Sequence, residues 1–245
     1  MKRVERGARS TIVAIVVMLT ATVGWAARPG ADRVLQLTPD EPLFCLRINN
    51  LDKSLSDASG SLTEIAPEGF DAKAMALGKL TEMLSAERME QVRQRGSFAI
   101  YGVMLPNGQN QGPFANLFVG ILVPVKDYDA FVGSDTPDAK GITTLTVDGQ
   151  PRILATRFGG YALRAWPDAR DKIAQVRQMV GKDRKGLKDM LSEGVRTLAA
   201  ESPIWLYGNV QKASAIIRPM IFGKLEQIKA ELKKASEKQE SPIGD

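Results

Sequence analysis

One short stretch, residues 42–55, joins a strand to the start of a helix and constrains the fold more than any other feature of the sequence. Leu43–Ile48 is a mostly apolar run of strand length, and Asn50 follows where a helix begins. Asn suits such a junction because its side-chain oxygen accepts a hydrogen bond from an unpaired backbone N–H of the first helical turn. We therefore expect a buried strand that leads straight into a helix.

The same pattern returns near the other end of the chain. Pro203 begins a second apolar run with an aromatic centre, Asn209 ends it, and a helical stretch follows, as in the first unit but one residue shorter. Two interpretations stay open. The chain holds one module and the beginning of another, or the two units supply equivalent strands of one sheet.

Apolar runs and turn residues predict the other elements. Asp148-Gly149 and Gly159-Gly160 lie between apolar runs and predict two tight turns, because glycine tolerates the positive φ that such turns need. Two further runs, 97–105 and 116–125, are almost continuously apolar, which is typical of central strands covered on both faces. The strands are expected at 43–48, 97–105, 116–125, 142–147, 152–158, 161–166 and after Pro203.

Helices are expected between these strands and at the carboxyl end. The segment 28–37 is interpreted as an exposed lead-in, and 87–95 as a charged connection. We predict an α+β fold, in which a mostly antiparallel sheet of about seven strands carries helices packed mainly on one face. The globular domain is expected to span 38–210. Helices are predicted at 51–62, 71–84, 126–132, 168–180, 187–200 and 211–238, the last of them interrupted at Pro219.

The last predicted helix, within 211–245, has an apolar stripe that fades into Lys and Glu. Too little apolar surface remains there for full packing, so we expect a solvated tail. This segment could be a linker to the start of a second module, an oligomer contact or simply a polar terminus.

The first 26 residues have the pattern of a secretory signal peptide. A basic start precedes an apolar centre, Ile12–Val23, and the small residues Gly24 and Ala26 follow at the positions that signal cleavage needs. The alternative is an uncleaved membrane anchor through Ile12–Val23, because the uncharged stretch approaches the roughly 18 residues of a spanning helix. Both interpretations place the body outside the cytoplasm, in the periplasm or cell envelope.

Composition excludes several classes of function. The chain has no histidine, so a Ser-His-Asp triad, a Cys-His pair and a His-containing zinc site cannot be built. The net charge of +5 comes largely from the first 26 residues, and the rest carries only +2, which argues against a nucleic-acid partner. Cys45, the only cysteine, lies within an apolar strand and is expected to be buried and inert.

The best recognition candidate is the predicted hairpin tip, because exposed loops on rigid strands often carry binding. Its side chains Asn107, Gln109, Asn110 and Gln111 offer adaptable hydrogen bonds. Asp127 and Asp129 could be paired metal ligands, but two acids in the first turn of a helix are favoured there by the helix dipole alone. We therefore predict no catalytic residue, no metal site and no cofactor.

Three stretches give the chain a resemblance to a known group: residues 37–51, 98–103 and 119–125. On these stretches the chain resembles an uncharacterised group of long, exported bacterial α+β proteins built from tandem strand-helix modules. The resemblance implies an α+β domain behind a signal peptide and brings no activity and no functional residues.

These observations together predict an exported, non-catalytic binding or scaffolding domain of the cell envelope, whose partner is another envelope protein. One alternative is a His-free hydrolase with two carboxyl groups about 5 to 10 Å apart in a cleft. Another is a carrier of apolar ligands, which needs a cavity of at least roughly 300 Å³ between sheet and helices.

Overall fold

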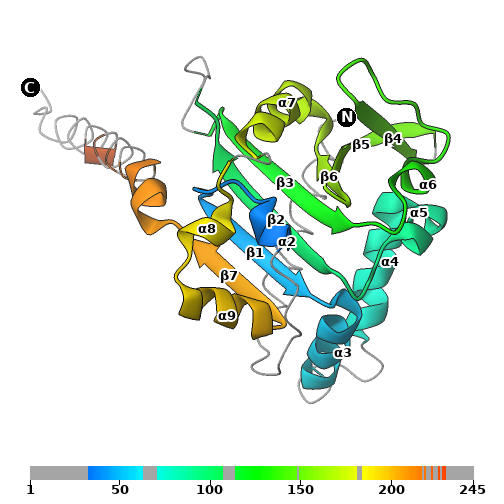
Figure 1. Ribbon diagram of the computed structural model, residues 1–245, viewed down its shortest axis with the longest axis horizontal. Coiled ribbons are helices and arrows are strands. Elements are labelled where there is room, and N and C mark those ends of the chain that lie inside the picture. Colours follow the sequence, from blue (N-terminus) through cyan, green and yellow to red (C-terminus); the bar gives the residue numbers. More distant parts are fainter. Residues whose placement is uncertain are drawn as a thin grey trace, which may run out of the picture.

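Seven antiparallel strands form one sheet in the order β4-β5-β6-β3-β2-β1-β7, which confirms the predicted α+β class and sheet (Figure 1). The computed structural model describes residues 33–62, 71–106, 114–147, 149–180 and 184–216, with isolated positions at 218, 222, 226, 228 and 229. The strands are β1 (Phe44–Asn49), β2 (Ser97–Met104), β3 (Leu117–Pro124), β4 (Ile142–Val147), β5 (Gln150–Phe158), β6 (Tyr161–Ala165) and β7 (Ile204–Gly208).

The two similar strand-helix units noted in the sequence supply neighbouring strands. In the antiparallel pair of β1 and β7, Phe44 lies opposite Gly208 and Ile48 opposite Ile204. Both units also use their Asn as a helix cap: the Lys53 N–H donates to Asn50 Oδ1 at 3.1 Å, and the Lys212 N–H donates to Asn209 Oδ1 at 3.0 Å. The second interpretation, two equivalent strands of one sheet, therefore describes the fold.

Helices cover both faces of the sheet, not mainly one as predicted. Alternate residues of each central strand are buried on opposite sides, so that Tyr101 belongs to one apolar cluster and Phe98 to the other. One face carries α2 (Arg33–Gln36), α7 (Arg170–Met179), α8 (Leu187–Met190) and α9 (Glu193–Glu201), which Figure 1 shows in front of the sheet. The other face carries α3 (Leu51–Leu62), α4 (Ala72–Leu84), α5 (Ala86–Gln91) and α6 (Tyr128–Val132).

The predicted tight turns of the meander are confirmed. Gly149 has a φ of 71° and lies just before β5, where Val147 pairs with Gln150. Gly159 and Gly160 have φ values of 59° and 88° and join β5 to β6. These left-handed conformations are accessible to glycine at little cost, so the local sequence determines both turns.

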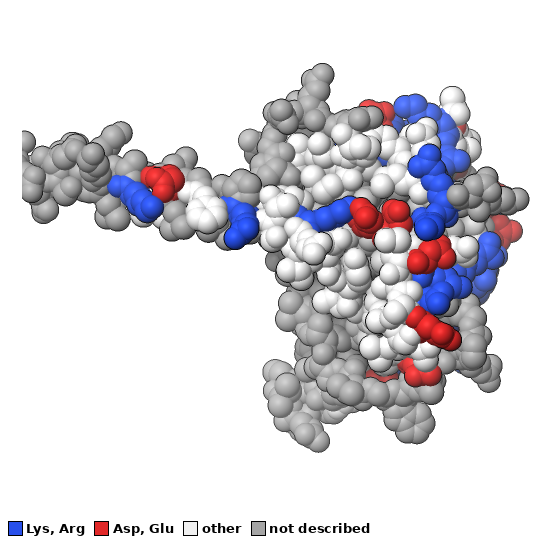
Figure 2. Space-filling view, turned by 60° about the vertical axis from the view of Figure 1, so that its left-hand side comes forward, with Lys and Arg blue, Asp and Glu red and all other residues white. Residues whose placement is uncertain are grey.

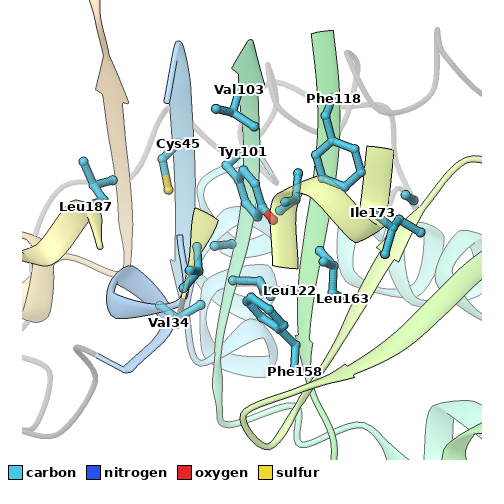
Figure 3. Close-up of a cluster of buried hydrophobic side chains, with 14 of the residues drawn as sticks. Val34, Cys45, Tyr101, Val103, Phe118, Leu122, Phe158, Leu163, Ile173 and Leu187 are labelled. Carbon is cyan, nitrogen blue, oxygen red and sulfur yellow. The ribbon is translucent and has the colours of Figure 1, made fainter. Parts of the chain in front are cut away.

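The segment 28–37, predicted to be an exposed lead-in, contains α2 and contributes to the core. Val34 and Leu35 are fully buried in the cluster that Figure 3 shows around Tyr101 and Phe118. The Leu187 N–H donates to Thr38 O at 2.9 Å, which ties the end of this segment to α8. Gly186 permits this contact, because a Cβ there would lie 2.3 Å from Gln36 O.

Two polar side chains of β1 hold the carboxyl end of α9. Buried Arg47 donates from Nη1 to Ala199 O, and Asn49 Nδ2 lies 2.7 Å from Ser202 O and 3.2 Å from Ala200 O. The last carbonyl groups of a helix have no partner within the helix, so these bonds satisfy acceptors that burial would otherwise leave unpaired. The predicted helix 187–200 is in fact two helices, α8 and α9, interrupted at residues 191–192.

Candidate functional site

The recognition residues predicted from the sequence, Asn107, Gln109, Asn110 and Gln111, lie outside the described residues, as does the segment 1–26. Strands β2 and β3, which flank the predicted hairpin tip, are described, and they pair with each other in the middle of the sheet. The binding role of this hairpin tip remains a prediction.

The first candidate for a ligand-binding site in the described structure is an apolar cavity of about 100 Å³ between the sheet and helices α3, α4 and α5. It is smaller than the roughly 300 Å³ expected for a carrier that encloses a drug-sized ligand. Thirteen of its fourteen lining side chains are apolar, and the remaining one is Arg164. The apolar side chains are Ile48, Leu51, Leu55, Ala76, Leu80, Met83, Leu84, Met89, Val92, Phe98, Ile100, Ile121 and Val123.

Helices α3 and α4 form one wall of this cavity. Asp71 caps α4 by accepting from the Ala74 N–H at 3.0 Å, and this hydrogen bond lowers the pKa of the Asp71 carboxyl. Lys73 of α4 forms a 2.7 Å ion pair with Asp52 of α3, and its hydrogen bond to Asp52 is the main cause of that carboxyl's lowered pKa. The Asp71 cap thus marks where α4 begins, and the ion pair joins α4 to α3 at the surface.

Arg164 is the unusual member of the cavity wall. Its side chain is only 3% exposed, and its Nε and Nη2 atoms have no hydrogen-bond partner among the described residues. Its neighbours across the sheet are Ile121 on β3 and Ala155 on β5, so neither adjacent strand offers an acid. Burial lowers the pKa of Arg164 to about 10, with a smaller contribution from the nearby positive Arg88, and the guanidinium stays charged at neutral pH.

The charge of Arg88 itself is balanced. Its Nη2 lies 2.5 Å from Asp135 Oδ2, and its Nη1 donates to Thr146 O at 2.8 Å. Asp135 in turn accepts from the Thr146 N–H at 3.0 Å. Asp135 therefore forms an ion pair with Arg88 and a hydrogen bond with the backbone of β4, and it does not contact Arg164 as a hydrogen-bond partner.

Other groups considered for chemistry have structural roles. Cys45 is fully buried, as expected, and burial raises the pKa of its thiol to about 12. Asp127 accepts the N–H groups of Asp129 and Ala130 as the cap of α6, and Asp129 pairs with Arg157 at 2.5 Å. No three His, Cys, Asp or Glu side chains in the described part of the chain lie close enough together to hold a metal ion.

A second feature is an apolar surface on the β7 side of the sheet, which we call the β7 surface. Leu206 is 58% exposed on β7, and Val210 is 77% exposed just beyond it. Figure 2 brings this side forward and shows broad uncharged areas near the helix that follows β7, residues 210–216, where it joins the body. Large apolar side chains are also exposed on α8 (Met190) and on α9 (Val195 and Leu198).

The two edge strands of the sheet, β4 and β7, differ in the hydrogen bonds made by their outer sides. The outer edge of β4 is occupied, because Pro137 forms a bridge with Thr143, the Asp138 N–H donates to Ile142 O at 2.9 Å, and Asp135 accepts from Thr146. Within the described residues, β7 pairs only with β1. Its sequence, Ile-Trp-Leu-Tyr-Gly, has none of the charges or prolines that natural edge strands use to prevent further pairing.

Comparison with protein-family models, with curated proteins and with solved structures finds no match to this chain. Among the helices of the described residues, none combines the length and the apolar character needed to cross a bilayer. The two candidate sites are therefore interpreted from their own geometry.

Proposed function

We propose that this chain is an exported, non-catalytic protein of the cell envelope that binds another envelope protein through the β7 surface. Residues 1–26 support the location, because their basic start, apolar centre and small exit residues have the pattern of a signal peptide. The observation that carries the binding role is the combination of an edge strand, which pairs only with β1 in the described part of the chain, with exposed Leu206 and Val210.

The chemistry of this edge defines the partner. An exposed strand edge presents unpaired N–H and C=O groups, and an extended segment of another protein can add to it as a further strand. Backbone hydrogen bonds supply affinity in this mode, and alternate side chains supply specificity. Leu206 lies opposite Leu46 of β1 and shares its face of the sheet. We expect the partner strand to carry apolar side chains on the same face.

Site-specific crosslinking in the exporting cell tests this proposal. We would place a photo-activated phenylalanine analogue at Leu206 of the full chain, and at exposed Arg152 on β5 as a matched control. We expect one dominant crosslinked product at Leu206, absent at Arg152, and its mass identifies the partner.

A product of twice the chain's mass would replace the heterologous partner with a second copy of this chain. Equal, weak crosslinking at both positions would contradict binding at β7. Recovery of the protein from the cytoplasm would contradict export, independently of the crosslinking result.

A further inference from the structure

The cavity beside Arg164 has the chemistry of a binding site for a small organic acid. A buried charge is strongly unfavourable unless it is paired, and removal of its partner typically costs several kcal/mol. Every other lining side chain is apolar, and Asp135 is already bonded to Arg88 and to the Thr146 N–H. The described protein therefore places an uncompensated cation at one end of an apolar cavity.

The two unpaired atoms of Arg164 specify the shape of the missing anion. Nε and Nη2 project from the same edge of the planar guanidinium, so their N–H groups are parallel. Two parallel donors match the two oxygens of a carboxylate, and such bidentate pairs are among the stronger hydrogen bonds in proteins. A single guanidinium also matches the single negative charge of a carboxylate.

The cavity also limits the size of the apolar part. Its lining residues come from four consecutive strands, β1, β2, β3 and β6, so the cavity runs across the strands of the sheet. An apolar cavity of about 150 Å³ accommodates the six carbons of benzene, so a volume of about 100 Å³ suits a chain of about four carbons.

We propose that this cavity binds a short-chain monocarboxylic acid, with its carboxylate on Arg164 and its hydrocarbon chain running toward β1. The chain would pass between Leu80 of α4 and Ile100 of β2, both of which line the cavity. This site lies on the opposite face of the sheet from Tyr101 and Cys45.

Calorimetric titration of the purified protein with butanoate tests the site, with 1-butanol as the uncharged probe of equal length. Arg164→Met removes the charge, and an apolar replacement of a buried ion is usually tolerated. We expect this variant to bind butanoate at least ~10-fold more weakly, because charge-assisted hydrogen bonds are lost, while butanol binding stays nearly constant. Arg157→Met, which alters an exposed arginine on β5, is the control and should retain butanoate affinity.

A second pair of variants tests the apolar part with Arg164 intact. Ala76→Phe places a large side chain at a lining position, whereas Ala74→Phe puts the same side chain at an exposed position of α4. We expect the first substitution to abolish butanoate binding and the second to preserve it. The proposal is overturned if the parent protein does not bind butanoate at millimolar concentration, or if Arg164→Met binds it as tightly as the parent does.

Discussion

Asn49 connects three elements through one buried side chain. Its Nδ2 donates to the carbonyl groups at the end of α9, and its Oδ1 accepts from Ser97 Oγ at 2.7 Å. Asn49→Ala leaves buried acceptors of α9 without a donor, so we expect the free energy of unfolding to fall by about 2 kcal/mol. Urea unfolding monitored by circular dichroism measures this difference.

The adjacent asparagine provides the control. Asn50 caps α3 with a φ of 55°, a conformation that glycine adopts readily. Because glycine replaces a capping Asn at a cost of only a few tenths of a kcal/mol, Asn50→Gly should change stability little. Equal losses for the two variants would mean that Asn49 contributes no more than an ordinary cap.

Cys45 makes a predictable contribution to the pH dependence of stability. Burial raises the pKa of its thiol from 9.0 to about 12, so the folded state keeps a proton that the unfolded state loses above pH 9. Deprotonation therefore favours the unfolded chain, and the free energy of unfolding should fall by up to about 1.4 kcal/mol per pH unit above pH 9. The buried Tyr101, whose pKa is also raised, acts in the same direction at higher pH.

Urea unfolding between pH 8 and about pH 10.5 measures this slope. Cys45→Ala removes only the thiol contribution, so the variant should lose stability less steeply across this range. Parallel pH profiles for the parent and the variant would rule out a thiol that stays protonated in the folded state.

At the scale of elements, the contact between α2 and α8 depends on the absence of a side chain at Gly186. A Cβ at this position would lie 2.3 Å from Gln36 O, and backbone cannot move as easily as a flexible side chain. We expect Gly186→Ala to lower the free energy of unfolding by about 1 to 3 kcal/mol, as overpacking does in other cores. Gly194→Ala in α9 is the control, because a Cβ there meets no atom within 4 Å. Thermal unfolding of both variants separates a steric cost from a general effect of alanine.

Local signals predicted all seven strands but not which segments meet in space. The turns at Gly149 and Gly159-Gly160 follow from glycine chemistry, and apolar runs located all seven strands. Helix α2 was missed because it is a single turn with two apolar residues, Val34 and Leu35, and it is stabilised by distant α8. The helices were assigned mainly to one face because apolar content alone does not show on which side of a sheet a helix packs.

The carrier alternative needed a larger apolar cavity between sheet and helices, and a small cavity with a charged residue in its wall was not predicted, although Arg164 left a signal in the sequence. Arg164 is the only charged residue of the apolar run 161–166, and a charge inside a strand that is buried on both faces requires a partner. Arg47 has the same sequence context, yet it bonds to Ala199 on α9. Only the packing of α3, α4 and α5 over the sheet distinguishes a structural arginine from one that faces a cavity.

At the scale of the whole molecule, the two edges of the sheet differ in whether another segment is bonded to them. The β4 edge is blocked by the segment 135–141, and the β7 edge is followed by a helix that leaves the body (Figure 1). Lys212 at the start of that helix forms an ion pair with Glu41, which precedes β1. The proposed strand addition and the continuing chain therefore share one side of the molecule, whereas Arg164 lies on β6, four strands away from β7.

Processing of the amino terminus decides whether this body is free or tethered. Cleavage after Ala26 needs small side chains at Gly24 and Ala26, whereas the intervening Trp25 is unconstrained. In cells that express the full chain, we expect a soluble extracytoplasmic species that begins at Ala27. Ala26→Trp should block cleavage and leave a full-length species in the membrane fraction, and Trp25→Ala should be processed normally. Intact mass after fractionation distinguishes these products. A parent protein found full-length in the membrane fraction would instead identify Ile12–Val23 as an anchor, and the β7 surface would then be presented close to the bilayer.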